Sequence, residues 1–119
     1  MKTNKFNISI LLLPLALIFL ANGLKSETAV YGNEETIIAL GSVVCGQCVT
    51  RVENALKKVD GVIDVTVDLD SKQARVTYDN SITSLDKLEN AITKAGYDAN
   101  DKKADRKAYN RLPGCCKGN

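Results

Sequence analysis

The sequence predicts an α+β fold in which an antiparallel sheet is covered on one face by two helices. Three observations support this prediction. Apolar side chains recur at spacings of three and four over residues 49–59 and 85–95, which is typical of amphipathic helices. Apolar and polar residues alternate over residues 63–69 and 73–78, which indicates two half-buried strands joined as a hairpin. A run rich in β-branched residues, 34–40, precedes the first helix and predicts another strand.

The boundaries of these elements follow from local signals. The loop 41–47 separates the first strand from the first helix, and Gly61 lies just past the end of that helix, where glycine is common. Residues 70–71 form the turn of the hairpin. Ser84 is predicted to cap the second helix, which ends at Gly96.

The residues after the second helix predict a short fourth strand and a helical tail. Residues 97–99 form a stub of extended chain, and the charged run 101–112 predicts a surface helix that Pro113 ends. The order is therefore strand, helix, strand, strand, helix, short strand. This is the βαββαβ or ferredoxin-like arrangement, with both helices on one face of the sheet.

The N-terminus predicts export. Lys2 and Lys5 precede an uncharged apolar run over residues 8–21, which ends in small residues. This is the pattern of a secretory signal peptide, and it is shorter than the ~20 residues that the alternative, an uncleaved membrane anchor, needs. We therefore expect a periplasmic or secreted protein with no stable membrane insertion after signal removal. The predicted organisation is a signal peptide at 1–23, a linker at 24–33, the α+β domain at 34–99 and a charged tail at 100–119.

Composition argues against several classes of function. Removing residues 1–23 takes away two lysines and no acid, which leaves 14 basic and 14 acidic side chains. This balance gives no support for a nucleic-acid partner. The remaining length allows one small domain, which we expect to be a monomer. The chain has no histidine, so the usual general base is missing and we expect a binding protein rather than an enzyme.

The four cysteines form two close pairs, Cys45/Cys48 and Cys115/Cys116. The first is a C-x-x-C motif at a strand-to-helix junction, where the partial positive charge of the helix N-terminus favours thiolates. Two thiolates without a third nearby ligand suit soft ions of low coordination, Cu(I) and Hg(II). Zn(II) and Cd(II) stay open, although Zn(II) generally needs four ligands.

Other interpretations of the thiols stay open as well. In an exported chain the C-x-x-C pair can be an inert disulfide, or a thiol–disulfide redox centre like that of thioredoxin-like proteins. Against the redox centre, the domain is short for that fold, and no proline lies where it could form a turn opposite the thiols. Cys115 and Cys116 are candidates for a second soft-metal site, for additional ligands of the first site, or for disulfide partners. Our hypothesis is that they add thiolates.

These features together resemble the heavy-metal-associated domain, a family that includes copper chaperones, modules of metal-pumping ATPases and periplasmic mercury-binding proteins. The resemblance covers about residues 36–99. It depends on the C-x-x-C motif and on three further stretches: Val-Asp-Gly-Val at 59–62, Ala-Ile at 91–92 and Ala-Gly-Tyr-Asp-Ala at 95–99.

The resemblance implies roles for particular residues. Both Cys45 and Cys48 would bind the metal, and Tyr97 would pack beside the metal loop. Val43 stands where the family usually has methionine, and it would fill the core beneath the loop with less volume. The resemblance also implies that the ion passes to a metal transporter or another carrier by thiolate exchange. Sequestration without a partner is the alternative.

Overall fold

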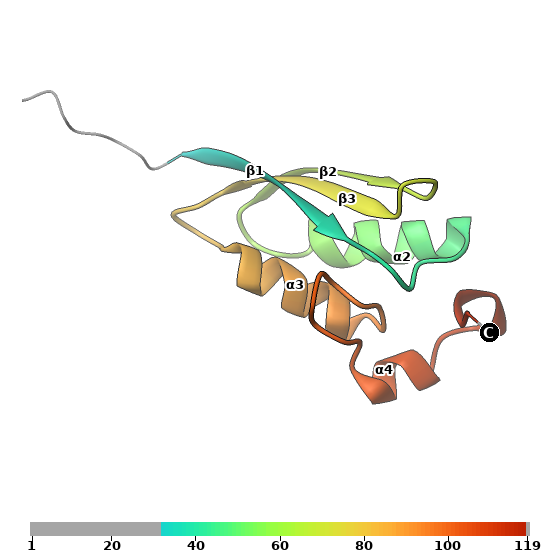
Figure 1. Ribbon diagram of the computed structural model, residues 1–119. Coiled ribbons are helices and arrows are strands. Elements are labelled where there is room, and N and C mark those ends of the chain that lie inside the picture. Colours follow the sequence, from blue (N-terminus) through green and yellow to red (C-terminus); the bar gives the residue numbers. More distant parts are fainter. Residues whose placement is uncertain (1–31, 119) are drawn as a thin grey trace, which may run out of the picture. The chain divides into compact units, whose positions relative to one another are not determined.

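The computed structural model describes residues 32–118 (Figure 1). The predicted signal peptide and most of the predicted linker lie outside these residues. No helix within 32–118 is long and apolar enough to cross a bilayer. In chain order the elements are β1 (Asn33–Ala39), α2 (Gly46–Lys57), β2 (Val62–Asp68), β3 (Gln73–Asp79), α3 (Leu85–Lys94), α4 (Arg106–Asn110) and the 3₁₀ turn η1 (Gly114–Cys116).

The sheet is antiparallel, with β3 between β1 and β2. Both long helices, α2 and α3, lie on the same face of it (Figure 1). The register places Ile38 of β1 opposite Ala74 of β3, and Val65 of β2 opposite Val76 of β3. All four side chains are buried, because residues two apart in a strand point to the same face. The predicted α+β fold and its hairpin are confirmed.

The core forms where the two helices meet the inner face of the sheet. Helix α2 buries Val52 and Leu56, and α3 buries Leu88 and Ile92, all with no solvent exposure. These are the apolar positions whose spacing predicted the helices. Full burial of each such side chain stabilises the fold by about 1.5–3 kcal/mol. The core therefore holds both helices, and with them the loops at their ends, in fixed positions.

The two helices begin differently. Helix α3 follows Ser84, whose hydroxyl accepts a hydrogen bond from the Lys87 N–H at 3.4 Å, as the sequence predicted. Helix α2 begins at Gly46, three residues before the predicted start, with Cys45 as a cap residue whose side chain makes no capping hydrogen bond to the backbone of the first turn. The first turn was missed because Gly46 and Gln47 are exposed and add nothing to the apolar pattern. Cys48 consequently lies inside the helix.

The short fourth strand predicted over 97–99 is not confirmed, since the described residues form a sheet of three strands. Asn100, instead of a fourth strand, forms hydrogen bonds with the end of β1. The Asn100 side-chain oxygen accepts the Ala39 N–H at 2.8 Å, and the Asn100 N–H donates to the Ala39 carbonyl at 2.9 Å. Asn100 has a φ of 53°, so the chain turns away from the sheet at this point. An isolated bridge between Ala99 and Lys102 closes the turn.

The redirected chain packs against the end of α3. The Asp105 N–H donates to the Thr93 carbonyl at 3.0 Å, and the Asp105 carboxylate caps α4 by accepting the Ala108 N–H at 2.9 Å. Ala108 and Leu112 are buried. Within the predicted helical run 101–112, only the five residues of α4 form a helix. The segment after α3 is thus part of the packed domain.

Gly96, at the end of α3, is required for this packing, and we expect Gly96→Ala to destabilise the fold by about 1–3 kcal/mol. Its φ is +104°, and a Cβ here would lie 3.1 Å from both the Ala108 carbonyl oxygen and the Leu112 side chain. The measurement is urea unfolding. Gly41→Ala is the matched control, because a Cβ at Gly41 meets nothing within 4 Å. Equal stability of the two variants would contradict the prediction.

Candidate metal centre

The loop between β1 and α2 is fixed by contacts with the core and with the chain after α3. The Val43 N–H donates to the Leu40 carbonyl at 3.1 Å, and both side chains are fully buried under the loop. The Ser42 hydroxyl accepts the Asp98 N–H at 2.9 Å, which ties the loop to the chain after α3. Val43 therefore lies in the core beneath the loop, where the family resemblance places it. These contacts fix the backbone from which the first cysteine pair projects.

All four cysteine sulfurs gather at the N-terminal end of α2. The Sγ of Cys45 lies 3.2 Å from that of Cys48 and 3.8 Å from that of Cys116. The Sγ of Cys115 lies 4.0 Å from that of Cys116. The sulfurs of Cys45, Cys115 and Cys116 all lie within 4.8 Å of one another. The four cysteines are free thiols, and the fold brings together both pairs that the sequence singled out.

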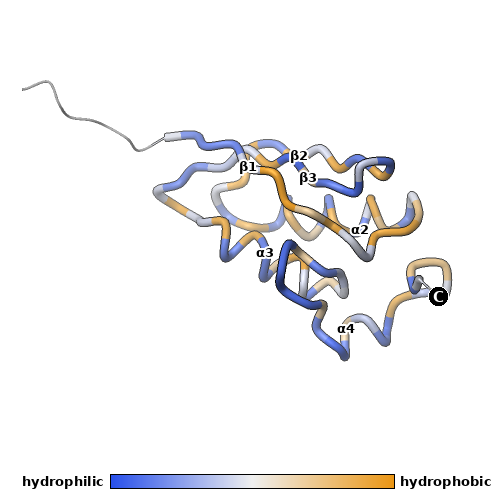
Figure 2. The backbone as a smooth tube through the Cα atoms, viewed as in Figure 1, coloured by the Kyte–Doolittle hydropathy of each residue, from blue (hydrophilic) through white to orange (hydrophobic). Residues whose placement is uncertain are grey.

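The four cysteines differ in their exposure to solvent. Cys48 is fully buried and Cys116 is 1% exposed, whereas Cys45 is half-buried and Cys115 is exposed. The turn before α2 and the C-terminal turn are both apolar and lie on the same side of the domain (Figure 2). An ion would therefore enter past Cys115 and Cys45 and bind against the buried sulfurs.

Gln47, the third residue of the C-x-x-C motif, was missed by the sequence analysis. Its side-chain oxygen accepts a hydrogen bond from the Cys115 thiol at 2.9 Å. The side chain thus links the motif directly to the second cysteine pair. Nothing in the local sequence signals this contact, because the two residues are 68 positions apart.

The two buried thiols differ in their pKa values. Burial alone would raise the pKa of Cys48, but the polar groups near its sulfur, the Val44 backbone first and then three neighbouring side chains, lower it to about 7. Burial raises the pKa of Cys116 to about 12, although the nearby Tyr97 hydroxyl acts to lower it. Of these two buried thiols, Cys48 therefore ionises more readily than Cys116.

Tyr97 lies at the base of the cluster. Its side chain is fully buried, and its hydroxyl has no hydrogen-bond partner of ordinary length. Burial raises the pKa of Tyr97, and so do the sulfurs of Cys116 and Cys48 that lie near its oxygen. The hydroxyl therefore stays protonated, as a donor facing these two sulfurs. Tyr97 packs beside the loop as the family resemblance implies.

In the reduced, metal-free chain we expect one thiol to ionise near pH 7. This transition should be absent from the titration of the Cys48→Ser variant. The fold lowers the pKa of Cys48 from 9.0, so the ionised thiol adds stability that is complete above pH 9 and is lost as the pH falls through 7. This amounts to about 1 kcal/mol between pH 6 and pH 8. Thiolate ultraviolet absorbance and urea unfolding measure the two effects. A transition that survives Cys48→Ser would assign it to another group.

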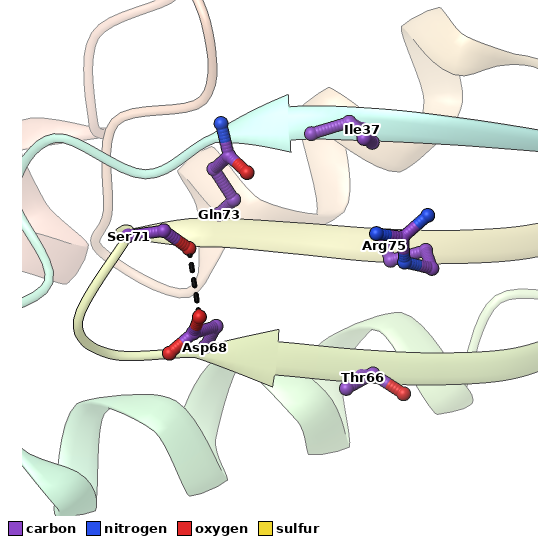
Figure 3. A pocket seen from close by; sticks show the side chains of 6 residues that line it. All are labelled: Ile37, Thr66, Asp68, Ser71, Gln73 and Arg75. Carbon is purple, nitrogen blue, oxygen red and sulfur yellow. Dashed lines mark hydrogen bonds between the residues drawn. The ribbon is translucent and has the colours of Figure 1, made fainter.

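A hollow of about 200 Å³ lies on the outer face of the sheet, away from the thiol cluster (Figure 3). Asp68 and Ser71 at its edge are joined by a hydrogen bond of 3.0 Å, and Arg75 forms an exposed ion pair with Glu35. None of the four cysteines lines it. The residues of β2 and β3 that line it, Thr66, Asp68, Gln73 and Arg75, are exposed to solvent. The chemistry of this domain is therefore concentrated at the thiol cluster.

Known proteins match the part of the chain that carries the C-x-x-C loop. The family model of the heavy-metal-associated domain matches residues 38–98, about half of the chain. A copper-exporting P-type ATPase of Staphylococcus saprophyticus is 39% identical over 79 residues. This match covers 65% of the chain but only 10% of the ATPase, so the chain spans about one tenth of the length of the curated relatives it matches.

Two kinds of small metal-binding protein are similar in structure over nearly their whole length. Oxidized MerP from Ralstonia metallidurans CH34 is 34% identical, with a TM-score of 0.55, over 56% of this chain and 93% of that one. The mercury-bound form of MerP, the periplasmic protein of the bacterial mercury detoxification system, has a TM-score of 0.52 at 34% identity, over 57% and 94%. The CopZ metallochaperone is 35% identical, with a TM-score of 0.54, over 56% and 98%.

Proposed function

The chain belongs to the heavy-metal-associated domain family, and from this premise we propose that it binds a soft metal ion, Cu(I) or Hg(II), between Cys45 and Cys48 and passes the ion to another protein. The ion is cargo rather than a resident cofactor. The family includes MerP, described in its mercury-bound form, and the metallochaperone CopZ. Both similarities cover nearly all of those proteins, which supports a carrier function for this chain.

One observation carries the proposal: two sulfurs, 3.2 Å apart, lie on the loop that the family shares. Thiolates select soft ions over the hard ions that carboxylates prefer. The lowered pKa of Cys48 supplies one thiolate near neutral pH, and binding releases the remaining thiol proton. The half-buried Cys45 leaves the ion accessible to an incoming ligand.

Transfer proceeds by ligand exchange at the exposed side of the site. A thiolate of the receiving protein approaches past Cys45, joins the ion, and a carrier thiolate then leaves. Because the incoming bond forms before the outgoing bond breaks, no bare ion is released. The similarity to a domain of copper-exporting ATPases supports a metal transporter, or another carrier, as the receiving protein.

Export is part of the proposal. The N-terminal pattern over residues 1–23 supports a signal peptide and a periplasmic or secreted location. MerP, which is similar over 94% of its chain, is a periplasmic protein. Mass spectrometry of the chain recovered from the periplasmic fraction would give its first residue; an intact Met1 there would contradict cleavage.

Native mass spectrometry of the reduced chain, offered Cu(I), Hg(II), Zn(II) and Cd(II) in competition, tests the function. We expect one Cu(I) or Hg(II) ion per chain. Retention of Zn(II) in preference to both would contradict a soft-metal carrier. Rapid catalytic reduction of a protein disulfide by the same chain would instead favour the redox alternative.

A further inference from the structure

The C-terminal segment, residues 105–118, is anchored tightly enough to position a ligand. Its start is bonded to α3 through the Asp105 N–H, and Leu112 in its middle is only 6% exposed. Gly118, near its end, lies beside Val44 of the metal loop. The segment therefore spans from the end of α3 to the C-x-x-C motif, and it lies outside the residues 38–98 that the family model matches.

The turn η1 fixes the orientation of Cys116. The Cys116 N–H donates to the Pro113 carbonyl at 2.9 Å, and the Lys117 ammonium donates to the Asn110 carbonyl at 2.9 Å. The Lys117 ammonium also lies 6.0 Å from the centre of the Tyr109 ring. These contacts direct the Cys116 side chain inward, where it is 1% exposed. The turn therefore places the Cys116 thiol against the site.

The sulfur positions suit a shared ion. Three sulfurs in a plane around an ion, with bonds near 2.3 Å, are separated by about 4.0 Å. The Sγ of Cys116 lies 3.8 Å from that of Cys45, and the Sγ of Cys48 lies 3.2 Å from that of Cys45 in the same cluster. The Cys45–Cys48 pair needs to open by less than about 1 Å to reach this spacing. A rotation of the half-buried Cys45 side chain is the smallest change that would open it.

The Tyr97 hydroxyl lies at the buried side of the cluster. It is a buried donor without a hydrogen-bond partner, and its neighbours are the sulfurs of Cys116 and Cys48. Its single hydrogen can be donated to one sulfur, so a thiolate that binds the ion beside Tyr97 would supply the missing acceptor.

Cys115 also lies within 4.8 Å of the Cys45 and Cys116 sulfurs, but it differs from Cys116 in exposure and in its hydrogen bond. It is exposed, and its thiol donates to the Gln47 side-chain oxygen at 2.9 Å. A disulfide between Cys115 and Cys116 would close a strained ring, because adjacent residues cannot reach the usual geometry without distortion. Cys115 therefore lies at the mouth of the site and serves as an internal comparison for Cys116.

We propose that Cys116 is a third thiolate ligand, so that a single chain encloses a soft metal ion between Cys45, Cys48 and Cys116. This rests on the proposed function, since it adds a ligand to the same site. The third thiolate holds the ion from the buried side of the site and adds one bond that an incoming partner thiolate must replace. The chain is therefore a retaining carrier, from which the ion leaves only after Cys116 is displaced.

The test uses the reduced chain loaded anaerobically with one equivalent of Cu(I). X-ray absorption spectroscopy counts sulfur neighbours, and competition with a chromophoric Cu(I) chelator gives affinity and removal rate. The variants are Cys116→Ser and the matched control Cys115→Ser. We expect three sulfurs in the parent and in Cys115→Ser, and two in Cys116→Ser. Affinity should fall at least about tenfold in Cys116→Ser only, since even groups that merely orient ligands are worth 10–100-fold.

Several outcomes would overturn the proposal. They are two sulfurs in the parent chain, equal affinities of the parent and Cys116→Ser, a larger loss in Cys115→Ser, and a metal-bridged dimer in which a second copy supplies the sulfur. If the parent chain binds no Cu(I) or Hg(II) at all, the proposed function fails as well. If it binds the ion through two sulfurs only, the third ligand alone is refuted. If Cys116→Ser does not fold, the sulfur count of the parent and of Cys115→Ser still decides.

Discussion

The double variant Cys45→Ser/Cys48→Ser is expected to lose roughly 10⁴- to 10⁶-fold in affinity for Cu(I). Four-ligand zinc sites bind with about 10–16 kcal/mol, or about 2.5–4 kcal/mol per ligand, so two lost ligands cost about 5–8 kcal/mol. A serine hydroxyl does not replace a thiolate, because it is a hard ligand that stays protonated near neutral pH. The two sulfurs are the pair at 3.2 Å on the family's loop.

Chelator competition measures this loss, and circular dichroism must show that the variant is folded. Cys48 is fully buried, so a hydroxyl there weakens the fold for reasons unrelated to metal. Cys45→Ser alone is the safer variant, since Cys45 is half-buried. Cys115→Ser serves as the control for a serine substitution within the cluster. A double variant that stays folded and keeps its affinity would exclude the C-x-x-C pair as the site.

Ile38→Ala is expected to lower the free energy of unfolding by about 2–5 kcal/mol, the usual cost of truncating a buried isoleucine. Ile38 is fully buried in β1. It lies two residues before Leu40, at the start of the loop that carries Cys45. A cavity here weakens the core and the support of the metal loop together. The variant should therefore bind Cu(I) less tightly even under conditions in which it is mostly folded.

The adjacent residue gives a matched control for this substitution. Ile37 is 46% exposed on the outer face of the sheet, so Ile37→Ala removes the same atoms from the same strand. We expect its cost to be within about 1 kcal/mol, as for surface substitutions generally. Urea unfolding of both variants tests the assignment of the inner face. A cost for Ile37→Ala equal to that for Ile38→Ala would contradict it.

The sequence predicted the elements whose signals are local. The spacing of Val52 and Leu56, and of Leu88 and Ile92, predicted both long helices, and Ser84 marked the start of the second. The alternation over 63–69 and 73–78 predicted the hairpin for the same reason. Most of the side chains that define these patterns are the ones that pack. Ile63 is an exception at 53% exposure, because the register between β2 and β3 shifts between Val62 and Asp64.

What the sequence did not predict depends on contacts between distant residues. The short fourth strand was expected from the extended stub at residues 97–99, but Asn100 forms the hydrogen bonds at the end of β1 and turns the chain away. Gln47 and Cys115 are 68 residues apart, and no local pattern indicates their contact. The sequence allowed only the hypothesis that Cys115 and Cys116 add thiolates. Their position beside the first pair depends on the C-terminal segment packing against the domain, where the buried Leu112 lies close to Gly96.

The contact between Cys45 and Cys116 joins positions 71 residues apart, which affects the order of folding. The hairpin and helices form from much nearer neighbours, and contacts of long sequence separation form slowly because loop closure costs entropy. We therefore expect the sheet to assemble before the C-terminal segment docks. The same segment should open most readily in the native state, with faster amide hydrogen exchange at Cys116 than at Val76 in the central strand. A chain built in this way completes its metal site last and can open it without unfolding the rest of the domain.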